Sequence, residues 1–252
     1  MKMSRIIGLV AISVVLLNRV SGQGFANLDF ESTLLSAGGF PTTVSASAAF
    51  PGWSVFIGTN AQSTVLYNSA TLGASSVAIL AGGSHSPVSE VYDGNFSALL
   101  VSGNDGDSSL SQTGLVPASA NSILLYVNMG PQRLATNFSI SLGGQTIQMV
   151  ALENYVSYSF ILYGGNISNF AGQVADLTLT SLSVGNGGVT YFELDDIQFS
   201  SSPVPEPSAL SLVGICFLLL YCRMQWPNKS LQQRRMASLV PLRGSHHLVP
   251  RA

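Results

Sequence analysis

Carboxylates near the two ends of the polar middle part of the chain are the residues best suited by type to do chemistry. Asp29 and Glu31 stand two residues apart, and Asp195 and Asp196 are adjacent. In an extended strand, alternation would place Asp29 and Glu31 on one face, opposite Phe30. Clustered carboxylates suit Ca²⁺, which takes about six to eight oxygen ligands. The alternative is a solvated strand edge beside a buried Phe30.

A second acidic segment, Gly103–Ser108, has the sequence Gly-Asn-Asp-Gly-Asp-Ser. It lacks the ligand spacing of an EF-hand loop and the glutamate that closes such a loop. Asp and Asn side chains also hydrogen-bond the backbone of tight turns. The segment is therefore interpreted either as a metal-binding loop or as an Asx-rich hairpin turn.

Catalytic groups are few between residues 23 and 202. His85 is the single histidine there and Arg133 the single basic residue, and both cysteines of the chain lie later, at Cys216 and Cys222. The segment contains no nucleophile elbow, no paired metal-protease histidines and no phosphate-binding glycine loop. A pair of carboxylates could still serve a glycosidase. We therefore expect a non-catalytic protein, with a small secreted polysaccharide hydrolase or lyase as the alternative.

The same segment is strongly acidic. It holds eleven Asp and Glu residues against one Arg, a net charge of −10, whereas the whole chain has −2. Such a surface repels phosphate backbones, so we expect no nucleic-acid partner, while neutral glycans and cations suit it. Because the segment has no cysteine, it must be held by its core, with a bound metal as a further option.

Aromatic side chains could form a platform on which sugar rings stack. Trp53, which follows a Pro-Gly pair, is expected in the core instead. Tyr155 and Tyr158 would point to opposite faces of a strand, so at most one of them would face outward. The other candidates are Tyr67, Tyr92, Tyr126, Tyr163 and Tyr191.

Short alternating or apolar runs separated by Gly, Asn and Pro predict β-strands, and no long helical periodicity is present. Residues 142–145, Leu-Gly-Gly-Gln, predict a hairpin, residues 167–171 a single helical turn, and residues 38–50 a long surface loop. The pattern predicts an all-β fold, an antiparallel β-sandwich of the jelly-roll type. The predicted strands are 26–30, 53–57, 77–80, 97–101, 109–113, 123–129, 137–142, 146–152, 155–162, 177–182 and 191–199.

Five short motifs, in their order along the chain, resemble those of the galactose-binding-like jelly rolls of many carbohydrate-binding modules. They are Asn27–Glu31, Pro51–Trp53, Ala98–Leu100, Ser109–Thr113 and Glu193–Ile197. The resemblance implies that the first and last strands are neighbours and that their acids, with backbone carbonyls, hold a structural Ca²⁺. The implied ligands are Asp29, Glu31, Asp195 and Asp196. The alternative remains a solvated edge, with Phe30 and Ile197 in the core.

The beginning of the chain has the pattern of a signal peptide. Lys2 and Arg5 precede the apolar run 6–17, and the small residues 20–22 follow it. Residues 1–22 are therefore predicted to be a signal helix that is removed after Gly22, and residues 23–202 the exported domain. Arg19, close to the expected cleavage point, leaves an uncleaved anchor as the alternative.

A second apolar run, Ala209–Cys222, carries no charge. As a helix its 14 residues would span about 21 Å, which is a short transmembrane segment at best. Six basic residues, from Arg223 onward, follow it, so the positive-inside rule predicts a cytoplasmic C-terminus. A buried core helix is the alternative. Residues 224–252 are expected to be a basic, disordered tail.

The segment Val204-Pro205-Glu206-Pro207-Ser208, followed by the apolar run and Arg223, resembles the PEP-CTERM sorting signal of Gram-negative bacteria. The same tail has also been named an ice-binding protein C-terminal domain, a label that describes the tail and not ice binding. The resemblance implies transient anchoring in the inner membrane and cleavage near Pro-Glu-Pro by an exosortase-type protease, over residues 203–223. The chain departs from the family pattern by continuing for 29 residues past Arg223.

Together these patterns predict an exported, non-catalytic protein of the cell surface or of an extracellular polysaccharide matrix, with polysaccharide as a candidate partner. Two alternatives stay open, a polysaccharide-cleaving enzyme and a purely structural matrix component. Two close carboxylates in a cleft would favour the enzyme. A row of exposed aromatic residues on one sheet face would favour glycan binding.

Overall fold

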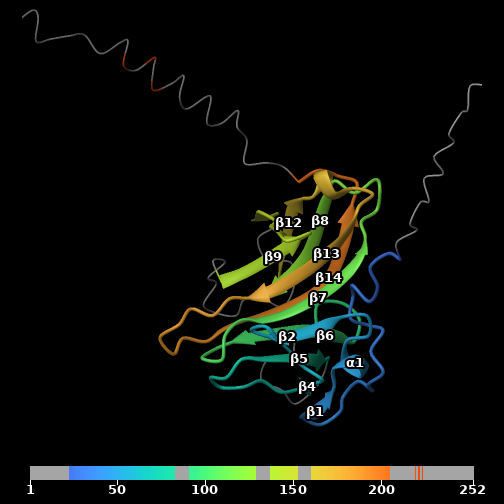
Figure 1. Ribbon diagram of the computed structural model, residues 1–252, viewed down its shortest axis with the longest axis vertical. Helices are drawn as coiled ribbons and strands as arrows, with labels where there is room; N and C mark the ends of the chain where they lie inside the picture. Colours follow the sequence, from blue (N-terminus) through green and yellow to red (C-terminus); the bar gives the residue numbers. More distant parts are fainter. Residues whose placement is uncertain are drawn as a thin grey trace, which may run out of the picture. The chain divides into compact units, whose positions relative to one another are not determined.

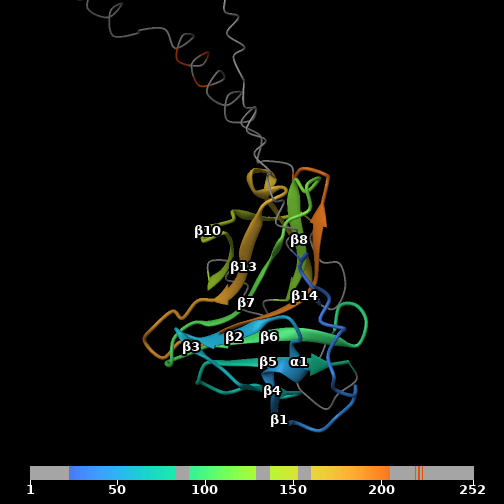
Figure 2. The ribbon, with the colours of Figure 1, turned by 45° about the vertical axis from the view of Figure 1, so that its right-hand side comes forward.

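Strands make up almost all of the regular structure in this computed structural model, which describes residues 23–82, 91–128, 137–152 and 160–204, and Leu219, Tyr221 and Arg223. The chain divides into two units, Met1–Val204 and Pro205–Ala252. In the first unit two mainly antiparallel sheets form a sandwich, which confirms the predicted all-β class (Figures 1 and 2).

Both predicted terminal helices fall largely outside this description. The signal helix (1–22) lies outside it entirely, as does the apolar run 209–222 apart from Leu219 and Tyr221. Among the residues described, no helix has the length and apolar character needed to cross a bilayer.

The larger sheet has eight strands. In spatial order they are β1 (Thr42–Ser45), β4 (Thr64–Tyr67), β5 (Ser76–Ala81), β6 (Phe96–Ser102), β14 (Thr190–Ser200), β8 (Ser122–Asn128), β12 (Ile161–Asn166) and β11 (Met149–Ala151). β4 and β5 pair in parallel, and the other neighbours pair antiparallel. The central strand β14 changes register between Asp195 and Gln198, an irregularity that re-aims side chains.

The smaller sheet has six strands. In spatial order they are β10 (Gln145–Thr146), β9 (Phe138–Leu142), β13 (Val174–Ser181), β7 (Ser108–Leu115), β2 (Ser54–Ile57) and β3 (Asn60–Ala61). The predicted hairpin joins β9 to β10, and both of its turn glycines have positive φ, 57° at Gly143 and 77° at Gly144. The predicted helical turn is a 3₁₀ helix at Ser168–Phe170.

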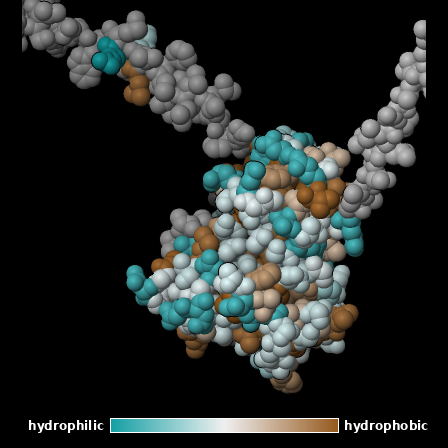
Figure 3. All heavy atoms as spheres, viewed as in Figure 1, coloured by the Kyte–Doolittle hydropathy of each residue, from teal (hydrophilic) through white to brown (hydrophobic). Residues whose placement is uncertain are grey.

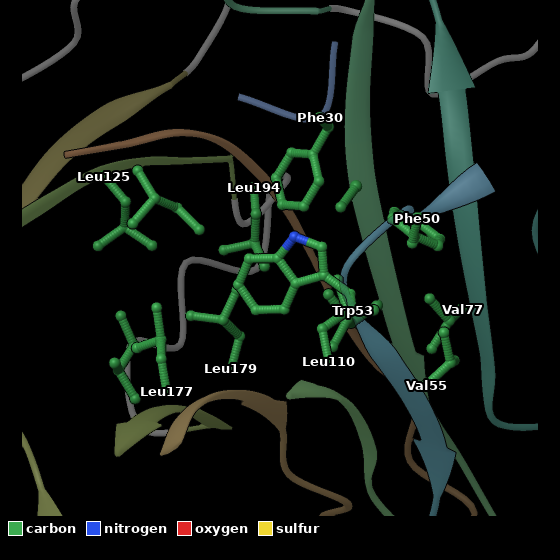
Figure 4. Close-up of a cluster of buried hydrophobic side chains, with 14 of the residues drawn as sticks. Phe30, Phe50, Trp53, Val55, Val77, Leu110, Leu125, Leu177, Leu179 and Leu194 are labelled. Carbon is green, nitrogen blue, oxygen red and sulfur yellow. The ribbon is translucent and has the colours of Figure 1, made fainter. Parts of the chain in front are cut away.

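Alternating sequence explains most of the core. In β13, buried Leu177 and Leu179 alternate with partly exposed threonines, and both leucines point into the space between the sheets. Figure 4 shows the Trp53 indole among Phe30, Leu179 and Leu194. Its Nε1 donates a hydrogen bond of 2.9 Å to the Asn27 carbonyl, so the polar end of the buried ring is satisfied. The expected core positions of Trp53, Phe30 and Ile197 are confirmed.

β5 and β6 are buried at every position. One set of their side chains enters the core of the sandwich. The other set lies on the outer face of the larger sheet, where Ala78, Leu80, Leu99 and Val101 form a second hydrophobic cluster. These four residues are buried, so other parts of the chain already cover most of this cluster.

The predicted strand 26–30 is wrong. This segment is a turn in which Asn27 and Phe30 have positive φ, 51° and 59°. The side chain of Gln112 takes the place of a strand partner, because its amide accepts from the Ala26 N–H (2.6 Å) and donates to the Ala26 carbonyl (2.9 Å). The alternation argument for Asp29 and Glu31 therefore does not hold, although Phe30 is fully buried.

The predicted loop 38–50 is also wrong. It contains β1, which pairs with β4, and the short helix α1 (Ala46–Ala49), which lies beside them (Figure 1). This segment belongs to the core, since Ala46 and Ala49 are buried. Its side chains are small, so the sequence lacks the large apolar residues that usually indicate a core segment. β3 and β4 were not predicted, and β12 extends to Asn166 through a Gly-Gly pair, beyond the expected end at 162.

Candidate functional site

The second cluster borders a pocket on the outer face of the larger sheet, of ≈ 280 Å³. Its lining residues are Ala70, Thr71, Leu72, Leu99, Val101, Val189 and Tyr191. Leu99 and Val101 come from β6 and Tyr191 from β14, which pairs with it. The other residues come from two loops, 68–75 between β4 and β5, and 182–189 between β13 and β14. We call these the first and second wall loops.

The chemistry of this pocket is mainly apolar. Of the seven described residues that line it, five are aliphatic and none is charged. The Thr71 hydroxyl is already engaged by the Ala74 carbonyl and by Ser76 Oγ. Among the described contacts, the Tyr191 hydroxyl has no hydrogen-bond partner within the protein. A ligand in this pocket would therefore meet aliphatic walls and one phenol.

The first wall loop is anchored at its start by the buried side chain of Asn68. Its Nδ2 donates to the Gly39 carbonyl (2.6 Å), and its Oδ1 accepts from the Ala81 N–H (2.7 Å). Asn68 has a φ of 50°, a conformation that asparagine tolerates better than most residues. The loop leaves β4 at a fixed angle, because this side chain is bonded on two sides.

The acidic segment Gly103–Ser108, which we call the corner turn, fastens both wall loops. The Ser75 N–H of the first wall loop donates to Asp105 Oδ2 (3.3 Å). The Ser183 N–H of the second wall loop donates to Asp107 Oδ1 (2.7 Å), and its hydroxyl donates to the Gly103 carbonyl (2.8 Å). The segment is a tight turn, but it joins β6 to β7 in different sheets, so the hairpin interpretation is corrected.

Two carboxylates continue the face beyond Tyr191, because alternate residues of β14 point the same way. Glu193 and Asp195 are each 1% exposed. The Glu193 oxygens accept from Ser97 Oγ (2.6 Å) and Asn128 Nδ2 (3.3 Å). These contacts hold the Glu193 carboxyl inside the protein and not open to a substrate.

The carboxyl of Asp195 accepts hydrogen bonds from three backbone N–H groups. Tyr92 and Asp93 donate to Oδ2 (3.1 Å each), and Asp196 donates to Oδ1 (2.8 Å). Burial raises the pKa of Asp195 to about 7, although the three hydrogen bonds act in the opposite direction and the charge of Asp196 adds to the rise. The group is thus a structural anchor for the segment 91–96.

Glu31 holds the other end of the same segment. Its Oε1 accepts from the N–H groups of Asn95 (2.8 Å) and Phe96 (2.7 Å), and its Oε2 accepts from Asn95 Nδ2 (3.2 Å). The close approach requires Gly94, since a Cβ there would lie 2.5 Å from the Glu31 carboxyl. Asp195 and Glu31 therefore clamp one loop between the turn 27–31 and β14.

Asp196 lies within the register shift in β14 and has a φ of 48°. Its pKa is raised by burial and by the charges of Asp93 and Asp29, against a hydrogen bond from Gln198 Nε2 (2.6 Å). Asp29 also accepts the Glu31 N–H (3.2 Å). Ile197 reaches the same turn through a 3.0 Å hydrogen bond from its N–H to the Leu28 carbonyl.

Electrostatic interactions link Asp196 with Asp29, Asp93 and Asp195, and the Asp29 carboxyl accepts the Glu31 N–H. We call these five residues, Asp29, Glu31, Asp93, Asp195 and Asp196, the acidic corner. Sequence reasoning missed Asp93, which reaches the corner from a loop far away in the chain. Within the described part of the chain, no group of three or more His, Cys, Asp or Glu side chains is arranged to hold a metal ion. Calcium at this corner therefore stays a prediction.

The predicted aromatic residues do not form one continuous row. Tyr92 and Tyr126 stack on each other with ring centroids 3.6 Å apart, while Tyr67 and Tyr163 are buried. Tyr191 alone lines the pocket. Tyr155 and Tyr158 lie outside the described residues, as do His85 and Arg133.

Of the predicted sorting residues, the structure describes only two. Val204 is 8% exposed at the end of the first unit, and Arg223 is exposed. Pro205, Glu206, Pro207 and Ser208 lie outside the described residues, as does the tail 224–252.

Comparison with known proteins gives a weak likeness to a solved structure. No protein-family model matches the chain, and no curated protein matches it either. Among solved structures, the chain is similar to TmCBM61, determined in complex with β-1,4-galactotriose, with 13% sequence identity and a TM-score of 0.33. The match covers 71% of this chain and 98% of the other.

Proposed function

We propose that this protein is an exported, non-catalytic component of the cell surface or of an extracellular matrix, and that it binds glycan on the outer face of its larger sheet. The pocket at Tyr191 is the observation that carries the proposal. It combines an aromatic ring, aliphatic walls and a hydroxyl that no described protein group engages, and its two wall loops are fixed by the corner turn. Sugar rings have apolar faces and hydroxyl edges, which suit such a surface.

The charge and the surface composition support the same function. A domain with a net charge of −10 suits neutral sugars or cation-bridged chains better than free anions. The face in Figure 3 is mostly of intermediate hydropathy, with scattered hydrophilic and hydrophobic residues.

The enzyme alternative is less favoured by the arrangement of carboxylates. Glu193 and Asp195 share one face of β14, but both are almost fully buried. Asp195 already accepts hydrogen bonds from three backbone N–H groups, and Glu193 accepts hydrogen bonds from two side chains. A general acid or a nucleophile must reach its substrate within hydrogen-bond distance, so these groups fit a structural role better.

Export and sorting belong to the same proposal. The signal-peptide pattern (1–22) and the Val204–Ser208 motif with Arg223 support secretion, transient inner-membrane anchoring and release by an exosortase-type protease. Expression in a host that has this protease should yield a shorter mature form, and mass spectrometry would locate its C-terminus. Secretion without cleavage near 204–208 would refute the sorting part alone.

Glycan binding is tested by affinity electrophoresis of the full-length chain through gels that contain neutral, acidic or acetylated polysaccharides. We expect selective retardation in at least one gel and its loss, by about tenfold in affinity, in Tyr191→Ala. The matched control is Val174→Ser, which removes a half-exposed apolar side chain from the other sheet. If no gel retards a folded sample, the glycan proposal is wrong and a purely structural role takes its place.

A further inference from the structure

The lining of the Tyr191 pocket restricts which sugar it can accept. The inference here rests on the proposed glycan function and concerns the chemical class of the bound residue. A fully hydroxylated hexose buries hydroxyl groups on every side, and each one that faces an aliphatic wall loses its hydrogen bonds to water at a cost of about 1–3 kcal/mol. Five of the seven lining residues are aliphatic. The pocket therefore disfavours common hexoses.

The polar groups of the pocket also restrict which sugar it can bind. Tyr191 offers one hydroxyl that no described protein group engages, whereas the Thr71 hydroxyl is occupied by Ala74 and Ser76. One available hydrogen-bonding group satisfies one ligand oxygen. The remaining contact area must be filled by carbon.

The charge and the volume of the pocket further limit the class of sugar residue that it can bind. None of the lining residues that the structure describes is cationic, and the domain as a whole is acidic, so uronate, sulfate and phosphate groups would enter without a counter-charge from these residues. The buried Glu193 pairs with Leu99 across β14 and β6, which places a carboxylate directly beside the pocket floor. A volume of ≈ 280 Å³ lies at the small end for ligand pockets and suits part of one residue, not a chain.

We propose that the pocket binds a neutral sugar residue that carries a methyl group, as a 6-deoxyhexose or an O-acetylated sugar does. The methyl group lies against Leu72, Val101 and Val189, and a ring oxygen meets the Tyr191 hydroxyl. Leu72 is fully exposed in the free protein, so its burial by the ligand adds apolar contact without a cost to the fold.

The test uses the full-length chain and sugar pairs that differ by the methyl-bearing group alone. One arm compares L-fucose with L-galactose and L-rhamnose with L-mannose, as free sugars, by saturation-transfer NMR. A second arm compares O-acetylated glucomannan with its alkali-deacetylated form, by affinity electrophoresis. Burial of one methyl group contributes about 0.8 kcal/mol, so we expect about fourfold stronger binding of the methyl-bearing member in at least one arm.

Two variants connect the preference with the pocket. Leu72→Ser should remove the methyl preference without unfolding the protein, because the side chain is exposed, and Tyr191→Phe should weaken both members of a pair equally. Val174→Ser is the control and should change neither. Equal binding within every pair, or a preference that survives Leu72→Ser, overturns the inference but leaves glycan binding standing. Absence of binding to any sugar or polysaccharide overturns the proposed function as well.

Discussion

Asp105 and Asp107 stand two residues apart in the corner turn, and each holds a different wall of the pocket. Asp105 accepts the Ser75 N–H of the first wall loop over 3.3 Å. Asp107 accepts the Ser183 N–H of the second wall loop over 2.7 Å. A segment that resembled a calcium loop in sequence thus sets the width of an apolar site, through hydrogen bonds to backbone.

Removal of the Asp107 carboxyl should loosen the second wall loop. In Asp107→Ala the Ser183 N–H loses its acceptor, so we expect the free energy of unfolding to fall by about 1–2 kcal/mol. Asp107→Asn keeps an oxygen at the same place and should lose less. Urea denaturation measures the change, and Asp176→Ala, which alters an exposed carboxylate on β13, is the control. Equal losses in Asp107→Ala and Asp107→Asn would contradict the hydrogen-bond explanation.

A glycine pair tests the contact between the corner turn and the first wall loop. A Cβ on Gly103 would lie 2.1 Å from the Gly73 carbonyl oxygen, which is backbone and can move only with its loop. A Cβ on Gly73 would have no neighbour within 4 Å. We therefore expect Gly103→Ala to destabilise by about 2 kcal/mol or more and to displace the wall, whereas Gly73→Ala is neutral or slightly stabilising. Thermal denaturation compares them, and similar melting temperatures would refute the close contact.

The sandwich could be predicted from the sequence because most strands alternate. β13 alternates buried leucine with threonine over Leu177–Thr180, and this period is local information that does not depend on the rest of the chain. The turn 26–30 could not be predicted in the same way. Its conformation depends on the Gln112 side chain, 86 residues away, which replaces a strand partner.

The candidate site was predictable only in part. The resemblance predicted that Asp29, Glu31, Asp195 and Asp196 share a calcium site, and the structure shows an electrostatic interaction between Asp29 and Asp196. Asp195 is buried and Asp196 is half-exposed, and a register shift that the sequence does not display separates Asp195 from Gln198. The pocket was missed because Leu99 and Val101 resemble ordinary core residues, and Leu72 resembles any surface leucine, until the wall loops bring them together.

Stability should depend on pH through Asp195. Its pKa is about 7 in the folded protein and 3.8 for the unperturbed group, so the folded state binds the proton more tightly. The stabilisation is complete below about pH 4 and is lost as the pH rises to about 7, by up to about 4 kcal/mol from this carboxyl alone. Asp196, whose pKa is also raised by burial, Asp93 and Asp29, changes stability in the same direction.

Urea denaturation at intervals between pH 4 and 8 measures this dependence. Asp195→Asn cannot ionise, so we expect a flatter profile in this variant, together with a loss of stability at pH 4 because one acceptor oxygen is replaced by NH₂. Asp176→Asn, on the exposed face of β13, should keep the profile of the unchanged protein. A profile that is unaffected by Asp195→Asn would assign the pH dependence to other groups.

Calcium is the remaining prediction for the acidic corner. The hydrogen bonds of Glu31 and Asp195 already occupy those carboxylates, so Asp29, Asp93 and Asp196 are the groups whose mutual repulsion a cation would relieve. A weak site, with a dissociation constant of about 1 mM, would add about 1.4 kcal/mol at about 10 mM calcium. We expect the melting temperature to rise by about 3–5 °C relative to sodium chloride of equal ionic strength. The rise should disappear in Asp196→Asn and persist in Asp176→Asn. An identical melting temperature in calcium and in EDTA would remove calcium from this corner and leave its carboxylates a structural role alone.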